Sequence, residues 1–182
     1  MDWTIEFDKA IEQYLPDLEA LQDEPMSRHT TFRIGGPAKR MAFPSSREQL
    51  VLLMSFAKNY GANPLVIGNG SNLLVPDEGL DRLVIDTSAN LNRVERGSGN
   101  TVLADAGATL ARTADLACKS GLTGLEFAHG IPGTVGGGVY MNCGAYGSEM
   151  KDVVESSLVL GSDGEISILK ARQHGFSYRH SS

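Results

Sequence analysis

A glycine-rich bend at residues 66–75, VIGNGSNLLV, has the residue types that bind a phosphate group through the backbone. Gly68 and Gly70 permit positive φ and a close approach of a ligand. Consecutive backbone N–H groups in such a bend can surround an anion, and the serine and asparagine that follow add side-chain donors. The bend lacks the lysine of a Walker A loop, and Pro76 interrupts the helix that must follow a Rossmann fingerprint. We therefore expect either a pyrophosphate-binding bend or a tight turn between two core strands.

A second glycine-rich stretch, HGIPGTVGGG at residues 129–138, has five glycines in ten positions. Backbone that lies against a flat ring or its phosphates needs glycine, because a side chain would occupy the volume of the ligand. Close helix packing through Gly136–Gly138 is the alternative, and it needs no ligand. Two such loops in one chain favour a ligand with a pyrophosphate in the middle and a flat ring at one end, which is a dinucleotide.

The composition is that of an ordinary globular protein and argues against several classes of function. The 182 residues are 41% hydrophobic and 21% charged, with a net charge of −6. This acidic balance, without a basic stripe, argues against nucleic-acid binding. Residues 1–6 have no signal-peptide pattern, and no apolar run is long enough to span a bilayer. Cys118 and Cys143 lack metal-ligand spacing and are interpreted as reduced thiols.

From these features we expect a cytoplasmic protein that acts on a small molecule. We expect neither a nucleic acid nor a membrane among its partners, and no metal. No feature of the sequence predicts the oligomeric state.

Hydrophobic periodicity and capping residues predict three helices. Their residue ranges are 8–15, 45–61 and 109–121. Ser45 stands three residues before Glu48, which predicts a capping box at the start of the second helix. Thr109 is the expected N-cap of the third helix, and the second and third helices each end at a glycine. The acidic and poorly periodic residues 17–27 are interpreted as a connecting arm.

Apolar runs predict strands at residues 64–67, 81–87 and 100–106, and a hairpin at 152–170 with Asp163-Gly164 in its turn. Helices and hairpins mixed in this way predict the α+β class, with a βαβ-like first part and a more antiparallel second part. The expected organisation is an N-terminal helix and arm (1–27), a first subdomain (28–78) and a second subdomain (79–182).

Four stretches occur in an order that resembles the family of UDP-N-acetylenolpyruvoylglucosamine reductases, also called UDP-N-acetylmuramate dehydrogenases. They are TTFRIGGPA (30–38), VIGNGSNLLVPDEG (66–79), GLTGLEFAHGIPGTVGGGVYMNCGAYGSE (121–149) and FSYRHSS (176–182). The resemblance implies the two-subdomain FAD-binding fold shared with vanillyl-alcohol oxidase (the PCMH type), so that the two subdomains would both bind FAD. It also implies non-covalent FAD, NADPH as reductant, and a UDP-sugar whose enolpyruvyl ether becomes a lactyl ether in bacterial peptidoglycan precursor synthesis.

The resemblance also implies which residues hold the cofactor. The bend that would wrap the FAD pyrophosphate consists of Gly68, Asn69, Gly70, Ser71, Asn72 and Leu73. The stretch that would run past the flavin ring and its diphosphate includes Gly130, Ile131, Pro132, Gly133, Thr134, Gly136 and Gly137. These assignments agree with the reading of the residues themselves, which offer backbone donors to anions and no side chains against a ring.

Tyr178 and Arg179 match the Tyr-Arg pair of the family. By the resemblance, Arg179 lies near the substrate carboxylate and stabilises the enolate charge that forms when hydride reaches the β-carbon. Tyr178 would help to position the substrate, and a surface ion pair is the alternative role for Arg179. The proton-donating serine of the family belongs to a third, substrate-binding domain that we expect to be absent from this chain. Ser181 and Ser182 are not that serine.

Two other interpretations stay open at this point. The chain could belong to another oxidoreductase of the same flavin fold, or it could be a flavin-binding module without activity of its own. The third domain would distinguish the first of these interpretations from the reductase family, because that domain selects the substrate. A flavin-loaded chain that does not oxidise NADPH would favour the second.

Overall fold

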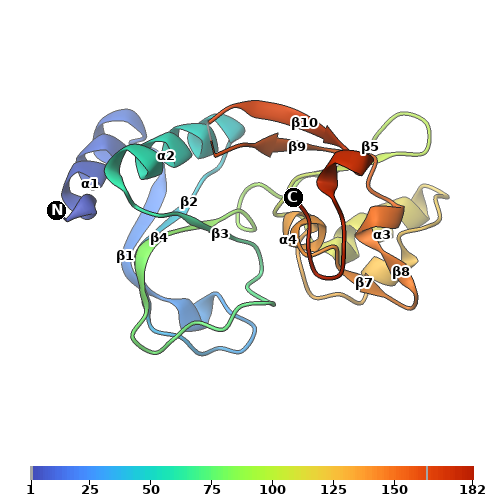
Figure 1. Cartoon of the computed structure of the whole chain (residues 1–182), viewed down its shortest axis with the longest axis horizontal. Coiled ribbons are helices and arrows are strands. Elements are labelled where there is room, and N and C mark those ends of the chain that lie inside the picture. The colour runs from blue at the N-terminus through green and yellow to red at the C-terminus, as the bar shows by residue number, and fades with distance from the viewer. Residues whose placement is uncertain (1, 163) are drawn as a thin grey trace. The chain divides into compact units, whose positions relative to one another are not determined.

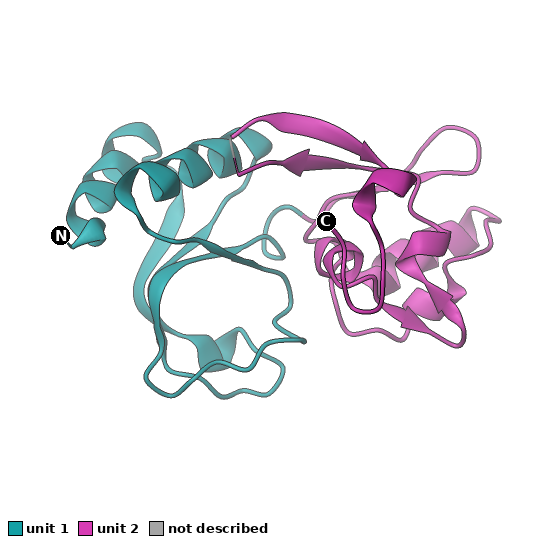
Figure 2. Ribbon diagram, in the orientation of Figure 1, with its two compact units in different colours: residues 1–91 teal, residues 92–182 magenta. Residues whose placement is uncertain are grey.

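The computed structural model describes residues 2–162 and 164–182. They form two compact units, of which the first ends at Leu91 and the second begins at Asn92 (Figures 1 and 2). Each unit has its own clusters of buried hydrophobic side chains. Within the described residues, no helix is both long enough and apolar enough to cross a membrane.

Unit 1 is a four-stranded sheet with two helices on one face. Its elements in chain order are α1 (Trp3–Tyr14), β1 (Glu19–Pro25), a 3-10 turn (Met26–Arg28), β2 (Pro37–Phe43), α2 (Arg47–Tyr60), β3 (Leu65–Ile67) and β4 (Leu80–Asp86) (Figure 1). The strand order is β1-β2-β4-β3. β1 runs antiparallel to β2, whereas β2 and β3 both run parallel to β4. The last strand in the sequence of this unit therefore lies inside its sheet.

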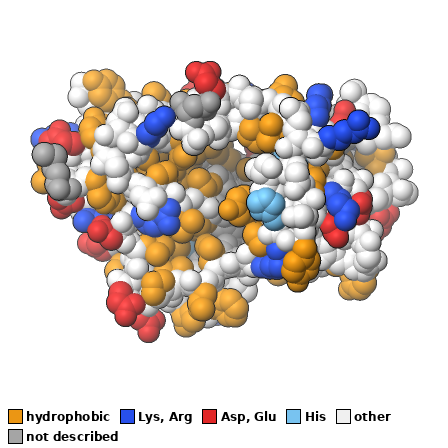
Figure 3. All heavy atoms as spheres, in the orientation of Figure 1, with side chains coloured by type: hydrophobic (Ala, Val, Ile, Leu, Met, Phe, Trp, Pro, Cys, Tyr) orange, Lys and Arg blue, Asp and Glu red, His pale blue; other side chains and the backbone are white. Residues whose placement is uncertain are grey.

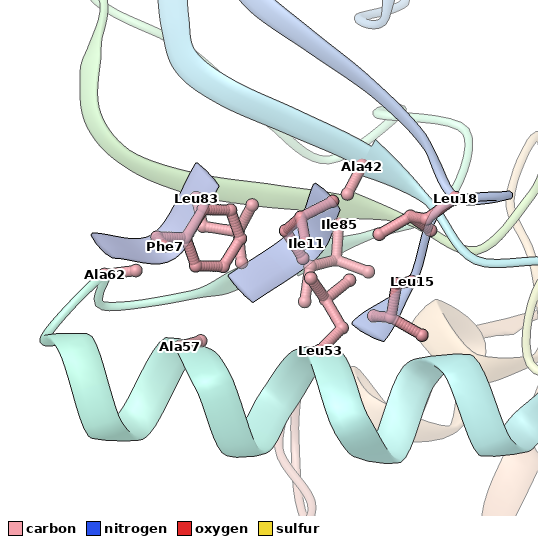
Figure 4. Close-up of a cluster of buried hydrophobic side chains, with 10 residues drawn as sticks. All are labelled: Phe7, Ile11, Leu15, Leu18, Ala42, Leu53, Ala57, Ala62, Leu83 and Ile85. Carbon is pink, nitrogen blue, oxygen red and sulfur yellow. The ribbon is translucent and has the colours of Figure 1, made fainter. Parts of the chain in front are cut away.

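Side chains alternate between the two faces of this sheet. On one face they pack against α1 and α2 in a cluster drawn in Figure 4, which consists of Phe7, Ile11, Leu15, Leu18, Ala42, Leu53, Ala57, Ala62, Leu83 and Ile85. The cluster on the other face consists of Met26, Ala38, Met41, Phe43, Ile67, Val75 and Val84. Met26, from the 3-10 turn, and Val75, from a loop, cover this second face, and no α-helix of the described residues contributes to its cluster. We call it the loop-covered face.

Helix α2 is confirmed, and its termini show why it begins and ends where it does. The hydroxyl of Ser46 accepts a hydrogen bond from the N–H of Gln49 at 3.1 Å, and Gly61 ends the helix with φ +73. The prediction that Ser45 caps the helix is wrong by one residue. Both the N–H and the hydroxyl of Ser45 donate instead to the side-chain oxygen of Gln49, at 2.8 and 3.0 Å.

This arrangement predicts unequal effects of two neighbouring substitutions. Ser46→Ala removes the acceptor for a helix N–H and should lower the free energy of unfolding by about 1 kcal/mol. Ser45→Ala removes only an exposed contact between side chains and should cost clearly less. Urea unfolding of both variants and of the unmodified chain measures the difference. A larger loss for Ser45→Ala would show that Ser45 is the true cap.

Three other sequence predictions for unit 1 differ from the structure. The irregular arm predicted at residues 17–27 is wrong, because Glu19–Pro25 forms β1 at the edge of the sheet. An edge strand with polar side chains facing solvent lacks the hydrophobic alternation that marks a strand. The boundary expected at residues 78 and 79 also moves, because β4 pairs with both β2 and β3 and so belongs to unit 1. The first helix starts earlier than predicted, at Trp3.

Unit 2 is built from short helices and antiparallel strand pairs. Its elements are β5 (Val94–Arg96), β6 (Val102–Ala104), α3 (Leu110–Lys119), α4 (Val135–Tyr140), β7 (Gly144–Ala145), β8 (Ser148–Glu149), β9 (Ser156–Leu160) and β10 (Ile166–Lys170), with 3-10 turns at Glu126–Ala128, Met150–Asp152 and Ala171–His174 (Figure 1). Consecutive strands pair as β5–β6, β7–β8 and β9–β10. The more antiparallel second part is therefore confirmed.

The core of unit 2 gathers around α3. It includes the buried side chains of Leu110, Phe127, Ala128 and Met150. Thr109 caps α3 as predicted, since its hydroxyl accepts from the N–H of Arg112 at 3.2 Å. The predicted hairpin at residues 152–170 is the β9–β10 pair, and Asp163 of its expected turn lies outside the described residues.

Candidate functional site

A cavity of about 390 Å³ opens in unit 1 beside the predicted pyrophosphate bend. Its walls come from residues 28–31 and Arg33, from Gly68 and Asn69, and from Asp86 and Ser88. Ile67, the last residue of β3, pairs with Asp86, the last residue of β4. The carboxyl ends of two parallel strands therefore open into one cavity, which is where sheets of this kind bind ligands.

The bend at residues 68–73 is built against the backbone of the loop at residues 28–33. Gly70 has φ +59, and a Cβ atom there would lie 1.9 Å from the carbonyl oxygen of His29. The carbonyl oxygen of Gly70 accepts a hydrogen bond from the N–H of Thr31 at 3.3 Å. Glycine at position 70 is therefore required by the fold itself, with or without a ligand.

The backbone amides of Gly68 and Asn69 donate to no group within the described part of the chain. Because both residues line the cavity, these N–H groups are available to an anion. Ser71 is half-buried, Asn72 takes part in an interaction within the chain, and Leu73 packs against the hydrophobic cluster of the loop-covered face. The capacity of the bend to bind an anion through its backbone is therefore clearest at its first two residues.

Two arginines and one carboxylate set the charge of the cavity. Arg28 and Arg33 both line it, and Arg28 lies 3.5 Å from Glu24. The buried Asp86 accepts hydrogen bonds at one carboxylate oxygen from the N–H of Ser88 at 2.7 Å and from the Ser88 hydroxyl at 2.6 Å. Ser88 thus occupies one oxygen of the carboxylate, and the guanidinium groups are suited to attract an anionic ligand.

His29 fixes the loop that carries these arginines. Its Nε2 atom lies 3.0 Å from Glu24 and its Nδ1 atom 3.8 Å from Asp86, while its ring packs 5.9 Å from that of Phe43. The candidate site residues named from the sequence did not include Arg28, Arg33 or Asp86. The stretch TTFRIGGPA, which begins directly after His29, is the signal that could have found this wall.

In unit 2 the second glycine-rich stretch forms the start of α4. Thr134 is its N-cap. The N–H of Val135 donates to the carbonyl oxygen of Ala108, and that of Gly136 to the carbonyl oxygen of Ala106, both at 2.8 Å. Many amides of this stretch are thus used within the chain, in contrast to those of Gly68 and Asn69. The stretch at residues 129–138 could therefore accept a ligand mainly because its glycines have no side chains that would occupy the space.

The glycines of this stretch fall into two groups. A Cβ atom at Gly136 would lie 2.8 Å from the Cβ of Ala106, and one at Gly138 would lie 3.1 Å from the sulfur of Cys143. Helix packing therefore explains these two glycines. A Cβ atom at Gly130 would meet no atom of the described chain within 4 Å. Helix packing does not explain Gly130, and the open space beside it leaves room for a ligand.

The other predicted residues of this stretch have mixed surroundings. A Cβ atom at Gly137 would meet only the Thr134 hydroxyl, at 3.4 Å. The carbonyl oxygen of Gly133 accepts a hydrogen bond from the N–H of Leu110 at 3.0 Å, and Ile131 packs against the core of unit 2. Pro132 is exposed. Burial raises the pKa of the nearby Cys143 thiol, which keeps this group protonated and uncharged at neutral pH.

Tyr178 and Arg179 are the two central residues of a tight turn. The N–H of Ser177 donates to the carbonyl oxygen of His180 at 3.0 Å, and the N–H of His180 donates back to that of Ser177 at 3.3 Å. Arg179 has φ +52, a conformation that costs a non-glycine residue on the order of 1 kcal/mol and that clusters at functional sites. Tyr178 is 91% exposed. The two consecutive residues at the centre of the turn thus carry a phenol and a guanidinium group.

Charged side chains of both signs are interspersed over the face shown in Figure 3, without a continuous basic patch. Large hydrophobic residues are also exposed on unit 1, and Phe32, Ile34 and Leu74 are among them. Phe32 and Ile34 follow Met26 in the chain and Leu74 precedes Val75, so all three belong to the loops whose residues Met26 and Val75 pack on the loop-covered face.

Comparison with protein families shows that residues 38–170 match a family described as FAD binding domain. Curated relatives include the UDP-N-acetylenolpyruvoylglucosamine reductases of Agathobacter rectalis, which is 46% identical over 96% of this chain, and of Bacillus subtilis, which is 45% identical over 90% of it. The match covers 59% of the first relative and 54% of the second. The chain thus spans a little over half the length of these relatives.

Solved structures give the same picture. The crystal structure of UDP-N-acetylenolpyruvylglucosamine reductase from Thermus caldophilus has a TM-score of 0.70 and 34% identity, and the match covers 90% of this chain and 56% of that one. A chitooligosaccharide oxidase also has a TM-score of 0.70, over 93% of this chain and 38% of its own, but at 16% identity this likeness concerns the fold alone. These matches confirm the predicted α+β, two-subdomain FAD-binding fold of the vanillyl-alcohol-oxidase type.

Proposed function

The chain belongs to the FAD-binding domain family, and from that premise we propose that it is the flavin-binding part of an enzyme that reduces UDP-N-acetylglucosamine enolpyruvate to UDP-N-acetylmuramate. NADPH is the reductant, and the reaction serves bacterial peptidoglycan precursor synthesis in the cytoplasm. The similarity to reductases of that name supports the proposal. Units 1 and 2 are its two FAD-binding subdomains.

The observation that carries the proposal is the cavity of unit 1. It combines the amides of Gly68 and Asn69, which donate to no group in the described residues, with the guanidinium groups of Arg28 and Arg33. These are the two kinds of donor that a pyrophosphate requires, namely backbone N–H groups in a concave bend and delocalised cations. The remaining residues of the bend, Gly70 to Leu73, shape it around the phosphates.

In unit 2, the stretch from Gly130 to Gly137 would lie along the flavin and its diphosphate. FAD, when bound, carries hydride from NADPH to the substrate. The contribution of the chain itself is to bind the cofactor without a covalent link, to keep side chains away from the ring, and to supply Tyr178 and Arg179. Tyr178 positions the UDP-sugar. The guanidinium of Arg179 stabilises the negative charge that develops on the substrate carboxylate as the enolate forms.

A comparison of two flavins tests the proposal. FAD should bind this chain on the order of 10-fold or more tighter than FMN, because FMN lacks the pyrophosphate and one charge-assisted hydrogen bond is worth about 1.5–3 kcal/mol. Titration of the flavin-free chain, followed by flavin fluorescence, measures both dissociation constants. Equal affinities would contradict the dinucleotide reading of the cavity.

A further inference from the structure

Asn142 is a buried polar residue whose backbone and side chain are both unusual. It is 5% exposed and has φ +42, a region that asparagine tolerates better than most residues. Its side-chain nitrogen donates to a carboxylate oxygen of Glu149 at 2.6 Å and to the carbonyl oxygen of Ser177 at 3.1 Å. Its side-chain oxygen accepts from the N–H of Lys151 at 3.0 Å. Both donors and the acceptor of one amide are thus in use.

The bond to Ser177 reaches across 35 positions of the sequence to the tight turn at residues 177–180. The same carbonyl oxygen accepts the N–H of His180 that closes this turn. The Asn142 amide therefore holds the carbonyl immediately before Tyr178 and Arg179. A second link lies on the other side of the turn, where the Ser181 hydroxyl donates to the carbonyl oxygen of Tyr140 at 3.1 Å.

The chemistry of the contact specifies an amide at position 142. Lys151 lies 2.9 Å from Glu149, and the hydrogen bonds from Lys151 and Asn142 lower the pKa of the Glu149 carboxyl. The group that faces Asn142 is therefore a carboxylate at neutral pH and needs a donor. Aspartate at position 142 would place a second carboxylate against Glu149 and against the Ser177 carbonyl oxygen, while keeping an acceptor for the N–H of Lys151.

We infer that Asn142 is a positioning residue, whose amide fixes the turn at residues 177–180 so that Arg179 is held in one orientation toward the substrate. The role of the turn in catalysis rests on the proposed function, in which the Arg179 guanidinium stabilises the negative charge that develops on the substrate. The contact itself is a property of unit 2. A rigid turn holds the guanidinium in the orientation in which it contacts the carboxylate, so less orientational freedom has to be lost when the substrate binds.

The test compares Asn142→Asp with the unmodified chain by amide hydrogen exchange in NMR. The N–H groups of Ser177 and His180 should exchange about 10-fold faster in the variant, because one buried hydrogen bond to the turn is lost. Amides inside α3 should keep their rates, and the affinity for FAD should not change. Glu149→Gln is the matched control, since it keeps an acceptor for the Asn142 amide, and it should leave the turn protected.

Asn142→Gly provides a second variant, since glycine adopts φ +42 without strain and removes only the side chain. It should speed exchange at Ser177 and His180 in the same way if Asn142→Asp does not fold. Unchanged exchange at the turn in a folded variant would overturn the inference. So would an equal acceleration in α3 or a parallel loss of FAD affinity, because either result would mean general support of unit 2. If the unmodified chain bound no FAD, the proposed function would fail while the exchange result at the turn would still stand.

Discussion

Replacing Gly130 by valine should lower the affinity of the chain for FAD by about 100-fold and leave its melting temperature unchanged. A Cβ atom at this position would meet no atom of the described chain within 4 Å, so the fold has no reason to reject a side chain. If the backbone here lies against the flavin, the added isopropyl group occupies the volume of the ligand. Overpacking of a filled space typically costs 1–3 kcal/mol, and about 3 kcal/mol corresponds to this loss of affinity.

Gly136→Val is the matched control for this prediction, because its Cβ atom would lie 2.8 Å from that of Ala106. This variant should lose thermal stability whether or not flavin is present. Flavin fluorescence titration and thermal unfolding of both variants separate ligand contact from helix packing. If Gly130→Val bound FAD normally, the stretch at residues 129–138 would owe its glycines to the fold, and the flavin assignment there would be withdrawn.

Arg179→Gly should reduce the rate of substrate reduction about 10²–10³-fold in an enzyme that carries this chain, which is the usual cost of removing one donor to a developing negative charge. The flavin half-reaction with NADPH should keep its rate, because no enolate forms in that step. Glycine adopts φ +52 without strain, so the substitution keeps the backbone conformation of the turn accessible. Stopped-flow measurement of the two half-reactions supplies both readouts.

Arg179→Lys tests whether a positive charge alone is sufficient or whether the planar guanidinium group is required. It should stay strongly impaired in substrate reduction, because an ammonium group cannot reproduce the two parallel hydrogen bonds of a guanidinium. It should also keep the backbone strain that Arg179→Gly removes. Equal slowing of flavin reduction and substrate reduction in either variant would exclude the enolate role of Arg179 and assign this residue to a shared or structural task.

The parts of the fold that follow a strong pattern could be predicted from the sequence. Helices α2 and α3 have a clear apolar face and capping residues, and β9–β10 has turn residues between two apolar runs. Strand β1 could not be predicted, because an edge strand with exposed acidic side chains is held by its backbone pairing with β2. Local sequence carries no signal of that pairing.

The candidate site could be predicted only in part, for a different reason. Glycine-rich patterns mark places where side chains are excluded, but they do not say whether the fold or a ligand excludes them. Gly70 and Gly136 are required by neighbouring chain atoms, whereas Gly130 is not. The arginines and Asp86 of the cavity come from segments more than 50 residues apart in the sequence, and only the sheet brings them together. The hydrogen bond from Asn142 to Ser177 likewise joins residues 35 positions apart, a spacing that no helix or strand period predicts.

The place of β4 in the sheet has a consequence for how unit 1 is made on the ribosome. β1 and β2 can pair as soon as both have been synthesised, but within the described sheet β3 has no partner other than β4. The parallel pairs therefore wait for a crossover connection to close, which is slow compared with closure of a hairpin. Until Asp86 leaves the exit tunnel, one side of β2 and the whole of β3 remain unpaired edges that can pair with other chains. The step that completes the sheet is also the step that brings Asp86 to the cavity, so nascent chains that end earlier lack both.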